Sequence, residues 1–265
     1  MKLSQHNAYY VALGSSFAAG LGLGLRAPGS PIVSQRSQNG YPHLLARLLD
    51  VSTFADMTSS GSTVHQVLNG GQWYLGPQVE ALGPDTRLVT LTAGGNDVGY
   101  IGDLMFSAYR NRRGVIGFLF RLLWKGPKSL DQRDFDSLDT NMRATLAEIR
   151  RRSPNALIIV ATYPTLLSTN ARCQELGLTD DQIKLMLPVG EKLAEITRIA
   201  AVDAGATIVD MAALSADHDV CGNEPWVNGA FPKIGTAFHP TFAGAQATAQ
   251  AIFSRIREVS GALVS

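Results

Sequence analysis

The chain has 265 residues, which suits one large α/β domain or two small ones and is enough to bury a sizeable core. Lys and Arg number 23 against 22 for Asp and Glu, and the resulting net charge of +1 gives no support for a nucleic acid or an acidic polymer as partner. No apolar run is long enough to span a bilayer, since Arg121 interrupts the longest one, Gly114–Trp124, so no stable membrane insertion is expected.

Residues 1–8 contain no apolar segment of the kind found in a signal peptide. The expectation from this stretch is a cytoplasmic protein by default, with secretion open if the N-terminus has been processed or trimmed.

Five β-rich apolar runs alternate with helical patterns along the chain. The predicted strands are Tyr9–Leu13, Val51–Met57, Arg87–Thr92, Ala156–Thr162 and Ala206–Met211. The first, third and fourth are almost continuously apolar, which is typical of parallel strands covered on both faces. Apolar residues recur at intervals of three and four in the predicted helices Tyr41–Leu49, Leu138–Arg152, Gly190–Gly205 and about Thr241–Val259.

This alternation predicts an α/β fold, a three-layer α/β/α sandwich around a central, mostly parallel five-stranded sheet. No internal repeat or linker is evident, so residues 1–265 are expected to form a single domain. Functional groups of such sheets gather at the carboxyl ends of the strands.

Three stretches with polar residues fall at these strand ends, and a fourth follows the fifth strand after a long loop. They are Gly14–Ser16 after the first strand, Asp56–Thr63 after the second, Thr92–Tyr100 after the third, and Gly235–Ala247 near the last helix. Together they bring a serine hydroxyl, the N–H of Gly61, the amide of Asn96 and the imidazole of His239 to one rim. A hydroxyl, a base and hydrogen-bond donors are the groups that acyl transfer requires.

The two serines, and other polar residues near these stretches, also have ordinary structural interpretations. Ser15 and Ser16 suit a helix N-cap as well as a nucleophile on a tight turn. His65 could lie on a helix surface or line the cleft, and His218 is expected to be solvated beside Asp219. Asp97 is expected to accept backbone N–H bonds that shape the Asn96 loop, in a supporting role.

The segment Tyr100–Phe135 is long for a connection and carries an apolar, aromatic patch. It is interpreted as an insert at about residues 100–135, either a helical excursion packed on the core or a cap that faces the substrate. Its apolar content favours a role as the apolar wall of a pocket and transient contact with lipid.

The two cysteines, Cys173 and Cys221, are too few for a disulfide scaffold. They could form one bridge or remain two small buried residues, and the residues themselves leave both alternatives open.

The four stretches, in order and at suitable separations, resemble the four blocks of the SGNH (GDSL-type) hydrolase superfamily. "GGND" at Gly94–Asp97 and His239-Pro240 are the more specific matches, whereas in "GSSF" Ser15 stands where the family usually has Asp. Further stretches, such as "VALGSSFAAG" and "DHDVCGNEPWVNG", are similar to the secreted actinobacterial esterases and lipases of that superfamily. In this branch Cys173 and Cys221 would fit the last of three disulfides.

The resemblance implies a role for each matched residue. Ser16 is the expected nucleophile and His239 the general base, while the oxyanion hole consists of the Ser16 N–H, the Gly61 N–H and the Asn96 side chain. Many members carry Asp three residues before the histidine, where this chain has Thr236. The expectation is therefore a Ser16–His239 dyad, in which the backbone carbonyl of Thr236 orients the imidazole.

These features together predict a carboxylic ester hydrolase of the esterase or lipase type that acts on a small-molecule acyl ester and uses neither a metal nor a cofactor. The alternatives are a carbohydrate acetylesterase, a thioesterase, or a non-catalytic protein of the same fold that binds acyl groups or glycans. Neither the oligomeric state nor the physiological substrate follows from the sequence.

Overall fold

The computed structural model describes residues 7–169 and 171–262. The expectation about a signal peptide concerns residues 1–8, of which residues 1–6 lie outside the described residues. Five strands form one sheet: β1 (Tyr10–Gly14), β2 (Phe54–Asp56), β3 (Leu88–Thr92), β4 (Leu157–Ala161) and β5 (Thr207–Val209). Their order is β2-β1-β3-β4-β5 and every neighbouring pair is parallel, so the predicted α/β fold is confirmed.

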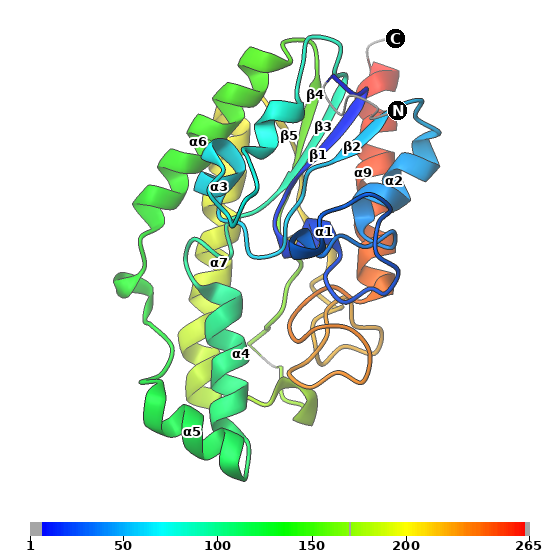
Figure 1. The fold of residues 1–265 in the computed structure, drawn as a ribbon. Coiled ribbons are helices and arrows are strands. Elements are labelled where there is room, and N and C mark those ends of the chain that lie inside the picture. Colours follow the sequence, from blue (N-terminus) through cyan, green and yellow to red (C-terminus); the bar gives the residue numbers. More distant parts are fainter. Residues whose placement is uncertain (1–6, 170, 263–265) are drawn as a thin grey trace.

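Helices cover both faces of this sheet (Figure 1). One face carries α2 (Tyr41–Leu49) and α9 (Phe242–Ala262), which pack on each other. The other carries α3 (Val64–Asn69), α6 (Phe135–Arg152) and α7 (Asp180–Asp203). Three further helices lie near the carboxyl ends of the strands or beyond them: α1 (Ser16–Ala19), α4 (Tyr100–Asn111) and α5 (Val115–Leu123). A short α8 (Met211–Leu214) follows β5.

The central strands are buried on both faces because their side chains alternate between two cores. In β1, Val11 and Leu13 join the core under α3, α6 and α7, while Tyr10 and Ala12 join the core under α2 and α9. All four side chains are fully buried. A strand with two buried faces has no polar side, which explains the continuous apolar runs of the sequence.

The insert has a more specific structure than the sequence predicted. It contains α4, which lies against α7, and α5, which packs on α4. Large apolar side chains of α5 point to solvent instead of lining a pocket, with Leu123 79% and Leu122 69% exposed. The expectation of a pocket wall is therefore wrong for α5.

Candidate active site

Ser16 lies directly after the first strand, at the start of a short helix. β1 ends at Gly14, Ser15 is the N-cap residue and Ser16 is the first residue of α1. The Ser16 Oγ lies 2.8 Å from the Nε2 of His239, although 223 positions separate the two residues in sequence. Both side chains are buried, with 5% and 4% exposed. The predicted pair of serine and histidine is thus in hydrogen-bond contact.

A tight turn orients the imidazole. The backbone N–H of His239 donates to the carbonyl of Thr236 at 3.2 Å, and Phe238 takes a left-handed backbone with φ +54°. The His239 Nδ1 lies 2.8 Å from the carbonyl oxygen of Ala237. A carbonyl only accepts, so Nδ1 carries the proton and Nε2 is left as the acceptor for the Ser16 hydroxyl.

This geometry corrects the expectation for Thr236. A backbone carbonyl does orient the ring, but it belongs to Ala237, because the carbonyl of Thr236 closes the turn by accepting the His239 N–H. Sequence comparison pointed to position 236 because a triad carboxylate stands three residues before the histidine in many relatives. The position of a main-chain acceptor depends on the backbone conformation of the turn instead. In this turn the carbonyl that points toward the His239 Nδ1 is that of Ala237.

Burial keeps the His239 imidazole neutral. Desolvation lowers the pKa of His239 to about 4, and the hydrogen bond to the Ala237 carbonyl opposes this only in part. A neutral imidazole with a free Nε2 lone pair can accept a proton at neutral pH.

Hydrogen bonds join the three loops that follow β1, β2 and β3. The N–H of Ser59 donates to the Gly14 carbonyl at 3.0 Å, and the N–H of Ser15 donates to the Thr92 carbonyl at 2.9 Å. The Asn96 Nδ2 donates to the Ser62 carbonyl at 2.9 Å. These contacts bring the predicted residues Ser16, Gly61 and Asn96 to one edge of the sheet.

The backbone at Gly61 requires a glycine. Its φ of +85° is unfavourable for residues with a side chain, and an added Cβ would lie 3.1 Å from the Gln72 Nε2. Among the residues that the structure describes, the N–H groups of Gly61 and Ser16 have no hydrogen-bond acceptor. Both donors therefore remain available to a bound oxygen atom.

A buried hydroxyl pair, which the sequence analysis did not single out, supports this edge. The Ser15 Oγ lies 2.8 Å from the Tyr163 Oη, which also accepts the Gly95 N–H at 3.2 Å. Ser15 is the N-cap of α1, but its hydroxyl makes no capping bond and contacts Tyr163 instead. Tyr163 follows β4 by two residues, so the strand-end rule could have marked it.

Asp97 has the supporting position that the sequence predicted. Its two carboxylate oxygens each lie 3.0 Å from the Val64 N–H at the start of α3. Burial raises the pKa of Asp97 to about 6, and the N–H bonds oppose this shift.

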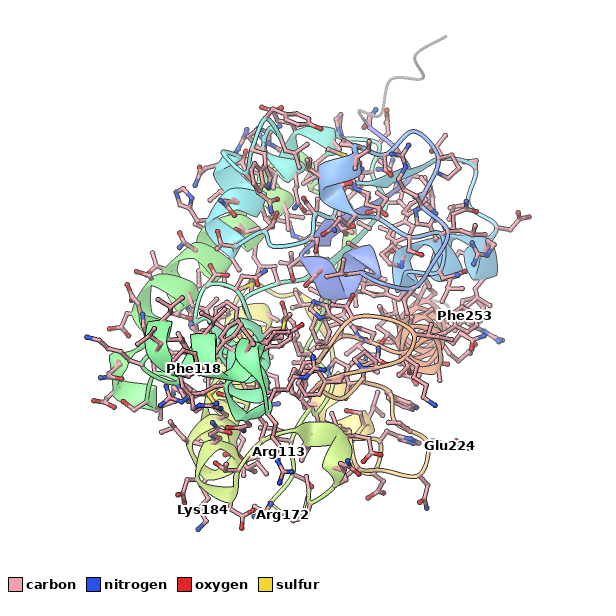
Figure 2. The ribbon with its side chains drawn as sticks, turned by 60° about the horizontal axis from the view of Figure 1, so that its bottom comes forward. Arg113, Phe118, Arg172, Lys184, Glu224 and Phe253 are labelled. Atoms are coloured by element: carbon pink, nitrogen blue, oxygen red, sulfur yellow. A yellow bond between two sulfur atoms is a disulfide. The ribbon has the colours of Figure 1, made fainter. Side chains whose placement is uncertain are left out.

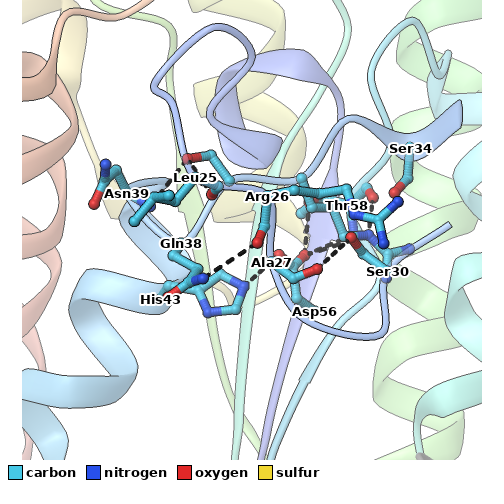
Figure 3. A network of polar contacts seen from close by, with 12 residues as sticks. Leu25, Arg26, Ala27, Ser30, Ser34, Gln38, Asn39, His43, Asp56 and Thr58 are labelled. Atoms are coloured by element: carbon cyan, nitrogen blue, oxygen red, sulfur yellow. Dashed lines mark hydrogen bonds and ion pairs between the residues drawn. The ribbon is translucent and has the colours of Figure 1, made fainter. Parts of the chain in front are cut away.

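A second polar network, also missed by the sequence analysis, fixes the loop after β2 (Figure 3). Asp56 accepts the backbone N–H of Thr58 at 3.0 Å and its hydroxyl at 2.6 Å, and the Asp56 Oδ2 lies 3.1 Å from the His43 Nε2. The Arg36 Nε donates to the Thr58 carbonyl at 2.5 Å. The network anchors the turn that leads to Gly61.

Of the histidines in the part of the chain that the structure describes, His65 and His218 lie outside this arrangement. His65 is exposed on α3, and the Nδ1 of His218 lies 2.8 Å from the Glu224 carbonyl while its ring stacks on Trp226.

An open hollow of about 700 Å³ adjoins the Gly61 loop. Its lining is mixed: apolar Ile32, Val33 and Trp73 stand beside Gly61 and the polar side chains of Ser60, Gln35, Gln66 and Gln72. Trp73 is 77% and Ile32 74% exposed, so the hollow offers apolar surface to a ligand beside Gly61.

Comparison with known proteins agrees with this geometry. Residues 12–247 match the model of the GDSL-like Lipase/Acylhydrolase family, and the chain belongs to that family. Lipase 1 of Streptomyces coelicolor is 26% identical over 89% of this chain and 81% of its own length, and Lipase 2 of the same organism is 31% identical over 80% and 72%. An extracellular lipase of Streptomyces rimosus has a similar structure, with a TM-score of 0.73 and 25% identity over 92% of this chain and 98% of that one.

The family and these relatives make the chain a carboxylic ester hydrolase of the SGNH type, from the branch that contains the actinobacterial lipases. The sequence-based predictions of superfamily, fold and enzyme class are therefore confirmed. The Cys173–Cys221 disulfide is also present, with 5.6 Å between the two Cα atoms.

Proposed function

We propose that this hydrolase acts through an acyl-enzyme formed on Ser16, with His239 as the general base. The observation that carries the proposal is the 2.8 Å contact between the Ser16 Oγ and the His239 Nε2. In this mechanism Nε2 takes the hydroxyl proton as Oγ attacks the ester carbonyl carbon. Loss of the alcohol follows, and His239 returns the proton to the departing oxygen.

Deacylation uses the same groups in reverse order. A water molecule attacks the acyl carbon, gives a proton to the His239 Nε2, and releases the carboxylic acid as Ser16 recovers its hydroxyl proton. The Ala237 carbonyl, bonded to Nδ1–H, holds the ring in place through both steps. Because a carbonyl lacks the full charge of a carboxylate, it stabilises the imidazolium less than a triad Asp would.

Three donors are assigned to the oxyanion. The N–H groups of Ser16 and Gly61 lack acceptors within the described part of the chain, and the Asn96 amide is fixed by its bond to the Ser62 carbonyl. Donors of this kind stabilise the negative charge that develops on the carbonyl oxygen of the ester.

The open hollow beside Gly61, with its exposed apolar side chains, supports an acyl ester as substrate. An ester whose carbonyl oxygen points toward the Gly61 N–H has an adjacent apolar surface, formed by Ile32, Val33 and Trp73, for one of its chains. The names of the relatives, lipase and esterase, agree with such a substrate.

The test is hydrolysis of p-nitrophenyl esters of graded chain length by the wild type and by Ser16→Ala. Activity in the wild type and a loss of at least ~10⁴-fold in Ser16→Ala are expected, because removing the nucleophile leaves only the donors and substrate binding. Ser15→Ala is the matched control. It keeps the hydroxyl of Ser16 and the imidazole of His239, so it should retain ester hydrolysis. Equal rates in the wild type and Ser16→Ala would overturn the proposal.

A further inference from the structure

The outer face of α5 is apolar and open to solvent. Six large side chains of the helix are at least 45% exposed: Val115, Ile116, Phe118, Leu119, Leu122 and Leu123. Spacings of three and four residues place them on a continuous helical face. Figure 2 shows Phe118 and Arg113 on the side of the molecule that lies beyond the carboxyl ends of the strands.

The inner face of α5 is already occupied. Phe120 stacks on Tyr109 of α4 at 5.2 Å between ring centroids, and Trp124 contacts Phe106 at 5.8 Å. Gly117 brings the helix against the preceding backbone, since an added Cβ would lie 1.7 Å from the Arg112 carbonyl oxygen. With α5 fixed on α4 in this way, no residue among 7–169 and 171–262 covers its apolar outer face.

The apolar face has a cationic border. Residues 104–130 contain six cations and no acidic residue, although the whole chain carries a net charge of only +1. The six are Arg110, Arg112, Arg113, Arg121, Lys125 and Lys128, and all except Arg110 are exposed. Within residues 7–169 and 171–262, none of them forms an ion pair with a carboxylate.

We propose that α5 and its cationic border dock the protein on anionic lipid surfaces, with the apolar face in the interfacial region and the cations on the lipid headgroups. Exposed apolar side chains bordered by Lys and Arg are the combination that such surfaces bind. The nine residues of α5 extend only about 14 Å, far less than the ~30 Å hydrocarbon core, so the helix lies on the bilayer instead of crossing it.

The charge pattern distinguishes a lipid surface from a second copy of the chain. In a symmetric contact between two α5 faces, the same unpaired cations of both copies would come together. Repulsion between like charges opposes that contact, whereas an anionic surface neutralises every cation at once.

Docking through α5 would also bring the lipid close to the loop that carries His239. Tyr109 of α4 contacts Phe231 at 5.6 Å, and the Arg112 guanidinium lies 4.9 Å from the Phe231 ring. Phe231 belongs to the same loop as His239, since the Phe238 N–H donates to the Gly229 carbonyl. The role of docking in catalysis rests on the proposed ester hydrolysis, to which it adds lipid aggregates as the source of substrate.

The test is cosedimentation with vesicles of phosphatidylcholine alone and with vesicles that also contain phosphatidylglycerol. The expected result is strong binding to the anionic vesicles, weakened by salt. Leu122→Ser/Leu123→Ser should abolish that binding. Arg113→Gln/Lys125→Gln/Lys128→Gln should weaken it on the order of 100-fold, since each headgroup contact is worth roughly fivefold. The matched apolar control is Ile199→Ser/Val202→Ser on α7, whose side chains are also exposed and which should bind like the wild type.

Soluble short-chain ester hydrolysis by the same α5 variants separates docking from folding and catalysis, and it should match the wild-type rate. Ser16→Ala should bind vesicles like the wild type even though it hydrolyses no ester, so the two proposals fail independently. No sedimentation with anionic vesicles, equal binding to both vesicle types, or a stable dimer that Leu122→Ser/Leu123→Ser dissociates would each overturn the docking proposal.

Discussion

At the scale of single residues, Asn96 combines a fixed position with a free donor capacity. One amide N–H of its Nδ2 is bonded to the Ser62 carbonyl, which leaves the second N–H for the substrate. Asn96→Ala should therefore lower kcat about 10²–10³-fold with little change in KM, because in the proposed mechanism the lost bond forms mainly with the oxyanion. Steady-state kinetics on a soluble ester measure both constants. A rise in KM at constant kcat would instead assign Asn96 to substrate binding.

The pH profile follows from the burial of His239. General-base catalysis uses the neutral imidazole, whose fraction rises as the pH rises through its pKa. Because that pKa is lowered to about 4, kcat/KM should stay on its plateau down to about pH 5 and fall with a midpoint near 4 instead of near 6.5.

Asp97 is the control for this profile, because its pKa of about 6 lies in the pH range where kcat/KM is expected to stay constant. Asp97→Asn should leave the acid midpoint near 4. An acid limb near pH 6 that disappears in Asp97→Asn would show that Asp97, not His239, governs the profile.

At the scale of secondary-structure elements, the sequence predicted the presence of the helices and strands better than the positions of their ends. The helix Tyr41–Leu49 is observed with the predicted bounds, because its apolar spacing is regular and Pro42 fits the first turn. The edge strands β2 and β5 are shorter than predicted, at Phe54–Asp56 and Thr207–Val209. An apolar run extends beyond the residues that find a pairing partner, and the sequence alone does not show where pairing stops.

The start of α7 illustrates why helix bounds were missed. The sequence analysis began this helix at Gly190, but the helix begins at Asp180 and passes through Pro188 and Gly190, two residue types that usually end helices. Packing explains the glycine: an added Cβ at Gly190 would lie 2.5 Å from the Tyr100 Oη of α4. Tertiary contact with the insert thus accounts for a residue that local propensity marks as a helix breaker.

The site shows the same division between local and distant information. Ser16 and His239 could be identified because the short stretches that contain them, taken in order with the other two, resemble the blocks of a known family. The Ser15–Tyr163 pair and the choice of the Ala237 carbonyl depend on how distant loops meet or on one turn's backbone angles, and neither leaves a short motif. The outward orientation of α5 was likewise not predictable, because its apolar residues fit a pocket wall equally well.

At the scale of the whole molecule, the Cys173–Cys221 disulfide links two residues 48 positions apart and closes a loop that contains α7 and β5. A cross-link of this length restricts the unfolded chain by about 4 kcal/mol in the chain-entropy account. Cys173→Ser/Cys221→Ser should therefore lower the free energy of unfolding by about 2–4 kcal/mol in denaturant titrations. Reduction of the wild type should reproduce this loss, and an unchanged unfolding midpoint in both experiments would contradict it.

Within the described residues, none of the helices is both long and apolar enough to cross a membrane. The parallel sheet, in the order β2-β1-β3-β4-β5, gathers the loops after β1, β2 and β3 at one edge, and the turn before α9 brings His239 to the same edge. The candidate chemistry depends on this convergence of residues from both ends of the chain.

Mapping of a fluorophosphonate adduct by peptide mass spectrometry tests the central claim most directly. The reagent bonds covalently to a serine hydroxyl that a neighbouring base activates. The predicted result is a single adduct on Ser16 that is formed by Ser15→Ala but is lost in Ser16→Ala and strongly reduced in His239→Ala. Modification of a different serine in the wild type, or labelling of Ser16→Ala at the wild-type rate, would contradict the account.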